Sequence, residues 1–257
     1  MKQKIFYYSD KLNDDFAGTN IKRKELPENY PYFRKNPLRK ISAFLLYRVL
    51  ATPIAFLFQK IVYHEKIIGR KKLKGYKKDG FFLYGNHTRA AGDAFAPSFV
   101  SFPKKAHIVV DPDCVSIPGL KAVVEDLGAL PLPTSFHGMK NFKNAVEEHA
   151  RQKHVVVIYP EAHIWPFYTD VRPFKDGSFR YPAECNKPVF TFTVTYKKRK
   201  LIPFPKATVY IDGPFFPDKD KSVKENQKLL RNICYETMKE RSKTSTYEHI
   251  KYVKTQP

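Results

Sequence analysis

The sequence predicts an α/β domain with a mixed, largely parallel central sheet flanked by helices, preceded by an amphipathic helical segment that associates with a membrane. From residue 81 onward, short continuous apolar runs alternate with segments of helical periodicity, which is typical of an α/β domain. The most apolar part of the chain lies before them, at residues 41–63. With 257 residues, 42% of them hydrophobic, the chain can bury one sizeable core.

Six apolar runs are predicted to be strands, mostly buried because polar residues do not alternate with apolar ones. They are residues 81–85, 106–110, 128–132, 154–160, 189–196 and 207–213. Helices are expected at about 88–101, 118–127, 136–152 and 222–243. Ser222 and Glu225 form a capping-box pattern at the start of the last helix. One face of the 136–152 helix is predicted to be apolar: Phe136, Met139, Phe142, Ala145, Val146 and His149.

The chain is expected to have three parts. Residues 1–40 are interpreted as an irregular basic and aromatic arm, because prolines interrupt them and a cluster of Arg and Lys ends them. Residues 41–66 are interpreted as an interfacial membrane helix or helix pair. Residues 67–257 are interpreted as the α/β domain.

The apolar segment favours lying in the membrane interface over crossing the bilayer. Arg48, Pro53, Gln59 and Lys60 interrupt it, so insertion across the membrane is costly. Pro53 is expected to kink the helix or split it into two arms. Flanking bases, including the run at 69–78, would meet anionic headgroups. The alternative is a core helix followed by a solvated basic loop.

Composition restricts the partners and the compartment. Lys and Arg number 46 against 25 acidic residues, and the formal net charge of +21 favours nucleic acid, anionic lipid headgroups or phosphorylated cofactors. Aromatic residues at 15% favour a lipid surface or an apolar substrate. Cys114, Cys185 and Cys234 are widely spaced and odd in number, which predicts a reducing, cytosolic setting. The N-terminus has no signal-peptide pattern, so export is not predicted.

The stretch FFLYGNHTRAAGDAF, residues 81–95, places His87 and Asp93 just after an apolar strand. Active sites collect at this carboxyl edge of a sheet. If His87 lies in the turn and Asp93 one turn into the next helix, the carboxylate can hold one imidazole nitrogen and leave the other as a base. Thr88 is the neighbouring hydroxyl in this stretch, so we expect the proton to come from the substrate, such as an alcohol that attacks an acyl group.

A second polar group follows another buried strand, in VVVIYPEAHIWPF at residues 155–167. There Glu161 is expected at the same edge as His87, so the two are predicted to line one cleft. Arg172 and Lys175 come next and would supply cations for a phosphate. Taken alone, Glu161 is also consistent with a carboxylate at a helix N-terminus.

The order of these motifs resembles the glycerolipid acyltransferase family, typified by lysophosphatidic acid and glycerol-3-phosphate acyltransferases. The resemblance rests on Asn86, His87 and Asp93, the segment SIPGLKAVVEDLGALPL around Gly119, YPEA at 159–162, FKDG at 174–177 and KPVF at 187–190. It covers residues 80–196, and its specificity lies in the ordered set.

The resemblance implies a glycerol-3-phosphate acyltransferase-like fold and a membrane-associated O-acyltransferase of phospholipid synthesis. His87 would be the general base and Asp93 would orient it, while an acceptor hydroxyl attacks a thioester on acyl-CoA or acyl carrier protein as co-substrate; no other cofactor and no metal is expected. Backbone N–H groups near the helix start after His87 would stabilise the oxyanion. The expected substrate-binding residues are Asn86, Arg89, Gly119, Lys121, Glu161, Arg172 and Lys175. The enzyme is expected on the cytoplasmic side of the membrane, peripheral or monotopic.

The chain departs from the family pattern at two places that grip the acceptor phosphate. Ala162, His163 and Ile164 stand where Gly-Thr-Arg normally follows the glutamate, and Pro133 and Thr134 stand where a basic residue is expected. Arg89, Lys121 or Arg172 would have to substitute. The acceptor therefore stays open between lysophosphatidic acid and another lysolipid.

Two other function classes are weighed. A metal-dependent hydrolase would use His87, Asp93, Glu161 and His163 as ligands. A basic nucleic-acid-binding protein would use the net charge, although the bases cluster beside an apolar helix and nucleic acid is not the expected partner. The remaining histidines His107, His137, His149 and His154 are interpreted as core or surface residues.

Overall fold

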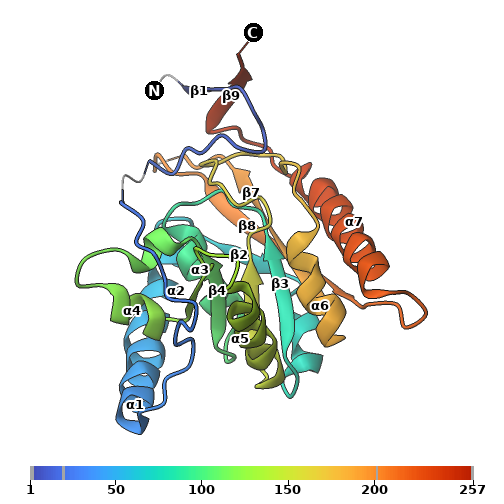
Figure 1. Cartoon of the computed structure of the whole chain (residues 1–257). Coiled ribbons are helices and arrows are strands. Elements are labelled where there is room, and N and C mark those ends of the chain that lie inside the picture. The colour runs from blue at the N-terminus through green and yellow to red at the C-terminus, as the bar shows by residue number, and fades with distance from the viewer. Residues whose placement is uncertain (1–2, 19–20, 201, 256–257) are drawn as a thin grey trace.

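A computed structural model describes residues 3–18, 21–200 and 202–255, and a seven-stranded sheet lies at the centre of this part of the chain (Figure 1). The strands in sheet order are β2 (Lys66–Ile68), β8 (Lys206–Phe215), β7 (Val189–Lys197), β3 (Phe81–Gly85), β6 (Val155–Ile158), β4 (Ala106–Val110) and β5 (Ala129–Pro131). β7, β3, β6, β4 and β5 run parallel, and β8 pairs antiparallel with β7. The mixed, largely parallel sheet predicted from the sequence is confirmed.

Helices cover both faces of the sheet, and β3 explains why. Its residues are fully buried, with Phe82 and Tyr84 packing on one face and Phe81 and Leu83 on the other. The first face is covered by α5 (Met139–Arg151), α6 (Arg180–Cys185) and α7 (Val223–Ser242). The second face is covered by α2 (Thr52–Ile61) and α3 (Gly92–Ser101), while α4 (Lys121–Asp126) lies between β4 and β5 in the chain.

The helix predictions hold best where local signals and burial agree. α7 begins with the expected capping box of Ser222 and Glu225. α5 buries Phe142, Ala145, Val146 and His149 as predicted, but it starts at Met139. Phe136 is 88% exposed and lies before the helix, so its place on the apolar face was wrong.

The N-terminal arm is more regular than predicted. β1 (Lys4–Tyr8) pairs in parallel with β9 (Ile250–Lys254), so the two ends of the chain lie together above the main sheet in Figure 1. Trp165 packs against Phe16 and Tyr252, which anchors this small sheet on the domain. The strands were missed because their pairing joins opposite ends of the chain.

The apolar segment forms one helical run rather than two arms. It begins with α1 (Pro37–Leu45), passes through a π-helical turn (Leu46–Ala51) and continues as α2. Pro53 does not split the run, and it directly follows the π-helical turn, whose last bond joins the Thr52 N–H to the Tyr47 carbonyl. Pro37–Ile61 is 25 residues long and contains an 18-residue window with a mean hydropathy of 1.8, which is enough by length and composition to cross a membrane.

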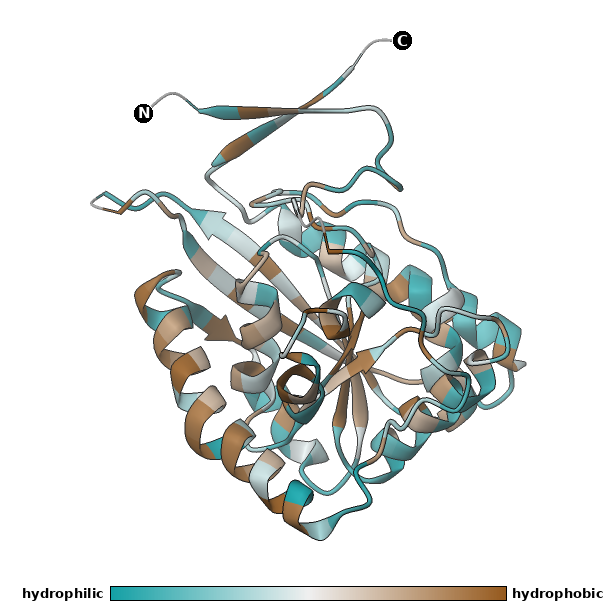
Figure 2. Ribbon diagram, turned by 60° about the vertical axis from the view of Figure 1, so that its left-hand side comes forward, coloured by the Kyte–Doolittle hydropathy of each residue, from teal (hydrophilic) through white to brown (hydrophobic). Residues whose placement is uncertain are grey.

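One side of this run is apolar and exposed. Leu38, Phe44 and Val49 are 74%, 61% and 67% exposed, and Figure 2 shows brown residues along much of the helix. The opposite side packs on α3 through Phe56 and Phe58. The interpretation as an ordinary core helix therefore accounts for only one side of the segment.

Candidate active site

The strand β3 delivers His87 to the carboxyl edge of the sheet, and Asn86 fixes its position. The Asn86 amide donates to the backbone carbonyl of Val194 at 3.0 Å and accepts from the Val194 N–H at 2.8 Å. Both ends of the amide are thus bonded to β7. Asn86 was predicted to bind substrate, and the structure instead places its buried side chain between two strands.

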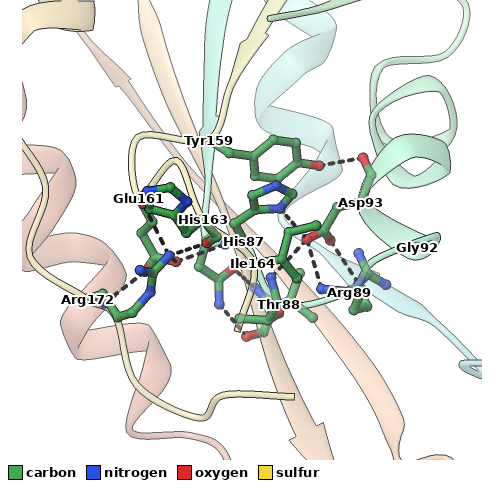
Figure 3. A network of polar contacts seen from close by, with 12 residues as sticks. His87, Thr88, Arg89, Gly92, Asp93, Tyr159, Glu161, His163, Ile164 and Arg172 are labelled. Carbon is green, nitrogen blue, oxygen red and sulfur yellow. Dashed lines mark hydrogen bonds and ion pairs between the residues drawn. The ribbon is translucent and has the colours of Figure 1, made fainter. Parts of the chain in front are cut away.

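His87 and Asp93 meet as predicted (Figure 3). The His87 Nδ1 lies 2.9 Å from the Asp93 Oδ2, because His87 is in the turn and Asp93 is in the first turn of α3. The imidazole stacks on Tyr159 with 4.4 Å between ring centroids, and the Tyr159 hydroxyl donates to the Asp93 carbonyl. The His87 side chain is 16% exposed and Asp93 only 1%, so the imidazole is the part of the pair that reaches solvent.

Asp93 also organises the backbone after His87. Its Oδ2 accepts the N–H groups of Thr88 and Arg89 at 2.8 and 2.9 Å. These two N–H groups are therefore not available to an oxyanion. The expectation that backbone N–H groups after His87 stabilise the oxyanion does not hold for Thr88 and Arg89. Charge-assisted bonds of this kind hold the carboxylate and the turn as one rigid unit.

Arg89 acts within the protein rather than on its surface. The guanidinium is fully buried and pairs with Glu65 at 2.6 Å and with Asp93 at 3.2 Å. Burial alone would lower the pKa of Arg89, but Glu65 and Asp93 raise it above its usual value. Arg89 was predicted to bind substrate, and in the structure its charge is paired with Glu65 and Asp93 inside the core.

Glu161 faces the loop of His87 rather than a cleft. Its carboxylate accepts the backbone N–H groups of His87 at 3.1 Å and Arg172 at 2.8 Å. Burial raises its pKa, opposed by Arg172 and by these N–H groups. The Arg172 guanidinium donates to the backbone carbonyls of Lys11, Glu161 and His163, and its side chain has no exposed area. Glu161 and Arg172 were predicted to bind substrate, and in the structure both side chains bond to backbone groups of the protein.

The loops after β3 and β6 are joined directly. The N–H of Trp165 donates to the His87 carbonyl and that of Phe167 to the Thr88 carbonyl. Ala162 has a positive φ of 63°, a left-handed backbone that glycine adopts without strain. Alanine thus adopts this conformation at the position where the family motif has glycine.

The other predicted binding residues lie elsewhere. Gly119 and Lys121 are exposed between β4 and β5, and the Lys121 ammonium lies over the Tyr30 ring. Lys175 lines a cavity of about 490 Å³ beside Phe174 and Arg231, away from His87. A larger cavity of about 1010 Å³ also excludes His87, Asp93 and Glu161. These three residues share one bonded network, because His87 contacts Asp93 through its ring and Glu161 through its backbone N–H.

Several residues of the network were not predicted. Glu65 and Gln59 hold the Arg89 guanidinium, and Gln59 also donates to the Gly92 carbonyl at 2.6 Å. Tyr159 lies in the YPEA motif, so its place beside the histidine could have been suspected. Glu65 and Gln59 belong to no recognised motif. Their role depends on how α2 and the residues after it pack on the sheet, so the sequence alone did not reveal it.

The alternative metal set does not converge. The His163 Nδ1 lies 3.8 Å from the Asp15 carboxylate at the surface, and Glu161 is turned toward backbone N–H groups. Within the described ranges, the one group of three potential metal ligands is His107, His149 and His154. It lies at the amino edge of the sheet, on the opposite side from His87.

A histidine paired with a carboxylate lies at the carboxyl edge of this sheet, after the strand β3. The family model described as Acyltransferase matches residues 65–195, about half of the chain, and the protein belongs to this family. The family predicted from the ordered motifs is thereby confirmed.

One solved structure supports the fold. The chain is similar to the crystal structure of the 1-acyl-sn-glycerophosphate (LPA) acyltransferase, PlsC, from Thermotoga maritima, with a TM-score of 0.55 and 16% sequence identity. The match covers 84% of this chain and 86% of that chain. A search among curated proteins gave no match.

Proposed function

We propose that the protein transfers a fatty acyl group from a thioester, acyl-CoA or acyl carrier protein, to the hydroxyl of a lysophospholipid, with His87 as general base. The observation that carries the proposal is the 2.9 Å bond between His87 Nδ1 and Asp93. That bond fixes the tautomer and leaves Nε2 for substrate, and Nε2 makes no hydrogen bond within the part of the chain that is described.

The proposed reaction needs one proton carrier. The lysophospholipid hydroxyl oxygen attacks the thioester carbonyl carbon, and Nε2 of His87 takes the hydroxyl proton. The tetrahedral intermediate then breaks its carbon–sulfur bond, and the leaving thiolate takes the proton from the imidazolium. A positioned base of this kind accelerates the reaction by about 10² to 10⁴.

The acceptor headgroup depends on which cations near the catalytic edge are free to bind it. Arg89 and Arg172 are engaged inside the protein, so neither supports a phosphate-binding role. Lys121 and Gly119 stay in the proposal, because they follow the carboxyl end of β4 and so leave the sheet at the same edge as His87. We therefore propose 1-acylglycerol 3-phosphate as one candidate within a class of lysophospholipids.

Membrane association is proposed from the helical run of α1 and α2. Its exposed apolar side would lie in the interface, on the cytoplasmic face, in a peripheral or monotopic arrangement. Gln59 of α2 is bonded to Gly92 and Arg89, so the same helix also contacts the loop that follows His87. This contact would hold the catalytic edge close to lipid.

A substrate panel tests the proposal. Purified protein in vesicles is incubated with labelled acyl-CoA or acyl carrier protein thioester and with lysolipids that carry or lack a terminal phosphate monoester. We expect a labelled diacyl lipid that depends on both substrates. Release of free fatty acid without any lipid product would contradict acyl transfer.

A further inference from the structure

The cavity of about 1010 Å³ lies at the amino edge of the sheet, opposite the proposed active site. His107 is the second residue of β4, and His154 directly precedes β6, whereas His87 follows the carboxyl end of the parallel strand β3. His149, in the last turn of α5, completes the group. The rest of the lining comes from the arm, α1 and the π-helical turn, and from loop residues that include Lys77 and 103–105.

The charge of this cavity is strongly positive. Eight Lys and Arg side chains line it, against three Asp and Glu. All three carboxylates already have partners, because Arg34 pairs with Glu125 and Asp126, and Arg151 pairs with Glu148. The excess of cations therefore has no counter-charge within the described part of the chain. A concave surface of one sign attracts ions of the other sign.

Three buried polar atoms of the lining have no hydrogen-bond partner: Arg48 Nη1, His107 Nε2 and His149 Nε2. The two imidazoles are more than nine-tenths buried. His149 Nδ1 lies 3.2 Å from His154 Nδ1, so when His154 donates, His149 carries its proton on Nε2. Arg48 Nη1 is an unpaired donor, as is His149 Nε2 in this tautomer; unpaired buried donors are costly, and an anion in the cavity would satisfy them.

The cavity also adjoins the apolar side of the helical run. Phe44 is 61% exposed and lines the cavity, and Arg48 follows one turn later. Leu38 and Val49 flank them on the exposed apolar side. A ligand that fits both features has a phosphate group for the cavity and acyl chains for the helix surface.

We propose that this cavity binds the headgroup of an anionic phospholipid, with its phosphate on Arg48, His107 and His149 and its acyl chains along α1. The inference rests on the proposed membrane association. The volume of the cavity suits a headgroup with its glycerol, since ligand cavities commonly measure about 300–1,000 Å³. The bound lipid would hold the end of the helical run that lies farthest from the catalytic edge.

A divalent metal is the competing ligand. The nitrogens of His107, His149 and His154 lie within 4.8 Å of one another, which is a plausible starting geometry for zinc. However, zinc would add two positive charges to a cavity whose cations already outnumber its carboxylates. The same cations favour a phosphate.

Calorimetric binding of monomeric dihexanoyl phosphatidylglycerol to the full chain tests the inference, with Arg48→Gln and Arg70→Gln as matched variants. Both arginines donate to neighbouring backbone carbonyls, of Pro103 and Phe102, but only Arg48 lines the cavity. We expect Arg48→Gln to weaken binding about tenfold or more and Arg70→Gln to leave it within about twofold. Equal effects of the two substitutions would overturn the assignment.

A second pair avoids any question of folding, because Lys77 and Lys78 are both exposed neighbours and only Lys77 lines the cavity. Lys77→Gln should weaken binding about threefold to fivefold and Lys78→Gln should not. The readout needs no acyl transfer, so His87→Ala, which removes the proposed base, should bind the lipid like the wild type. Failure of the proposed function would leave this result intact.

Three further probes distinguish the sources of the ligand. Inorganic phosphate should bind more weakly than the lipid, and dihexanoyl phosphatidylcholine should bind more weakly than the phosphatidylglycerol. Inorganic phosphate that binds as tightly as the lipid would overturn the lipid assignment. Zinc binding that His149→Ala abolishes, without lipid binding, would replace it with a metal site.

Discussion

Two regions of the molecule bury histidines at opposite edges of one sheet, and they differ in how their polar groups are satisfied. At the carboxyl edge, Asp93 accepts bonds from the His87 imidazole and from two backbone N–H groups. At the amino edge, His107 and His149 each leave a buried nitrogen without a partner. The first arrangement fixes a base in one orientation, whereas the second leaves donors for a ligand. Burial of a histidine alone therefore does not identify a catalytic one.

The largest effect is expected from Asp93→Asn. The amide cannot accept all the bonds of the carboxylate, so the imidazole loses its fixed tautomer and kcat should fall about 10² to 10⁴-fold. Steady-state acyl transfer measures this. Asp15→Asn is the matched control, because Asp15 lies 3.8 Å from His163 at the surface, and it should change kcat less than about twofold. Similar losses of kcat in both variants would contradict a special role of the His87–Asp93 pair compared with the His163–Asp15 pair.

The next largest effect concerns the buried charges beneath His87. Arg89→Met leaves Glu65 buried without its partner, and we expect a loss of about 3–5 kcal/mol in the free energy of unfolding. Denaturant unfolding measures it. Lys143→Met breaks a partly exposed pair with Glu184 and should cost less than about 1 kcal/mol. A cost for Arg89→Met no larger than that of the control would contradict the structural role assigned to Arg89.

Acid is expected to lower the free energy of unfolding through the buried histidines at the amino edge of the sheet. Burial, followed by neighbouring positive groups, lowers the pKa of His149 to about 3 and that of His154 to about 4, from 6.5. Below pH 6.5 the unfolded chain binds protons that the folded protein resists, so the free energy of unfolding should fall as pH drops from about 6.5 to 4. His149→Phe should make this fall shallower, as measured by denaturant unfolding at several pH values. An unchanged slope would show that His149 titrates normally.

The smallest effect concerns the loop after β6. Ala162→Gly relieves a left-handed alanine, so it should stabilise the protein by about 1 kcal/mol. Ala145→Gly, inside α5, should instead destabilise it by about 1 kcal/mol or more. Thermal unfolding of both variants checks the opposite signs. Destabilisation by Ala162→Gly would mean that the strain is compensated elsewhere.

The sequence predicted the features that depend on local pattern. Buried runs identified β3 and β6, and the spacing of His87 and Asp93 allowed their meeting to be anticipated. The partners of Arg89, Glu161 and Arg172 within the protein were not predicted, because a charged residue next to a motif looks the same whether its partner is a substrate or a buried group. Only packing distinguishes them, as the contact between Arg89 and Glu65 of a distant segment demonstrates.

The most direct test of the comparison is acyl transfer by His87→Gln and His149→Gln, assayed side by side with the same thioester and lysolipid. We expect kcat/KM to fall at least about 10²-fold in His87→Gln and to stay within about twofold of wild type in His149→Gln at saturating lipid. Full transfer by a folded His87→Gln variant would contradict the assignment of the general base. Loss of transfer confined to His149→Gln would place the chemistry at the other edge of the sheet.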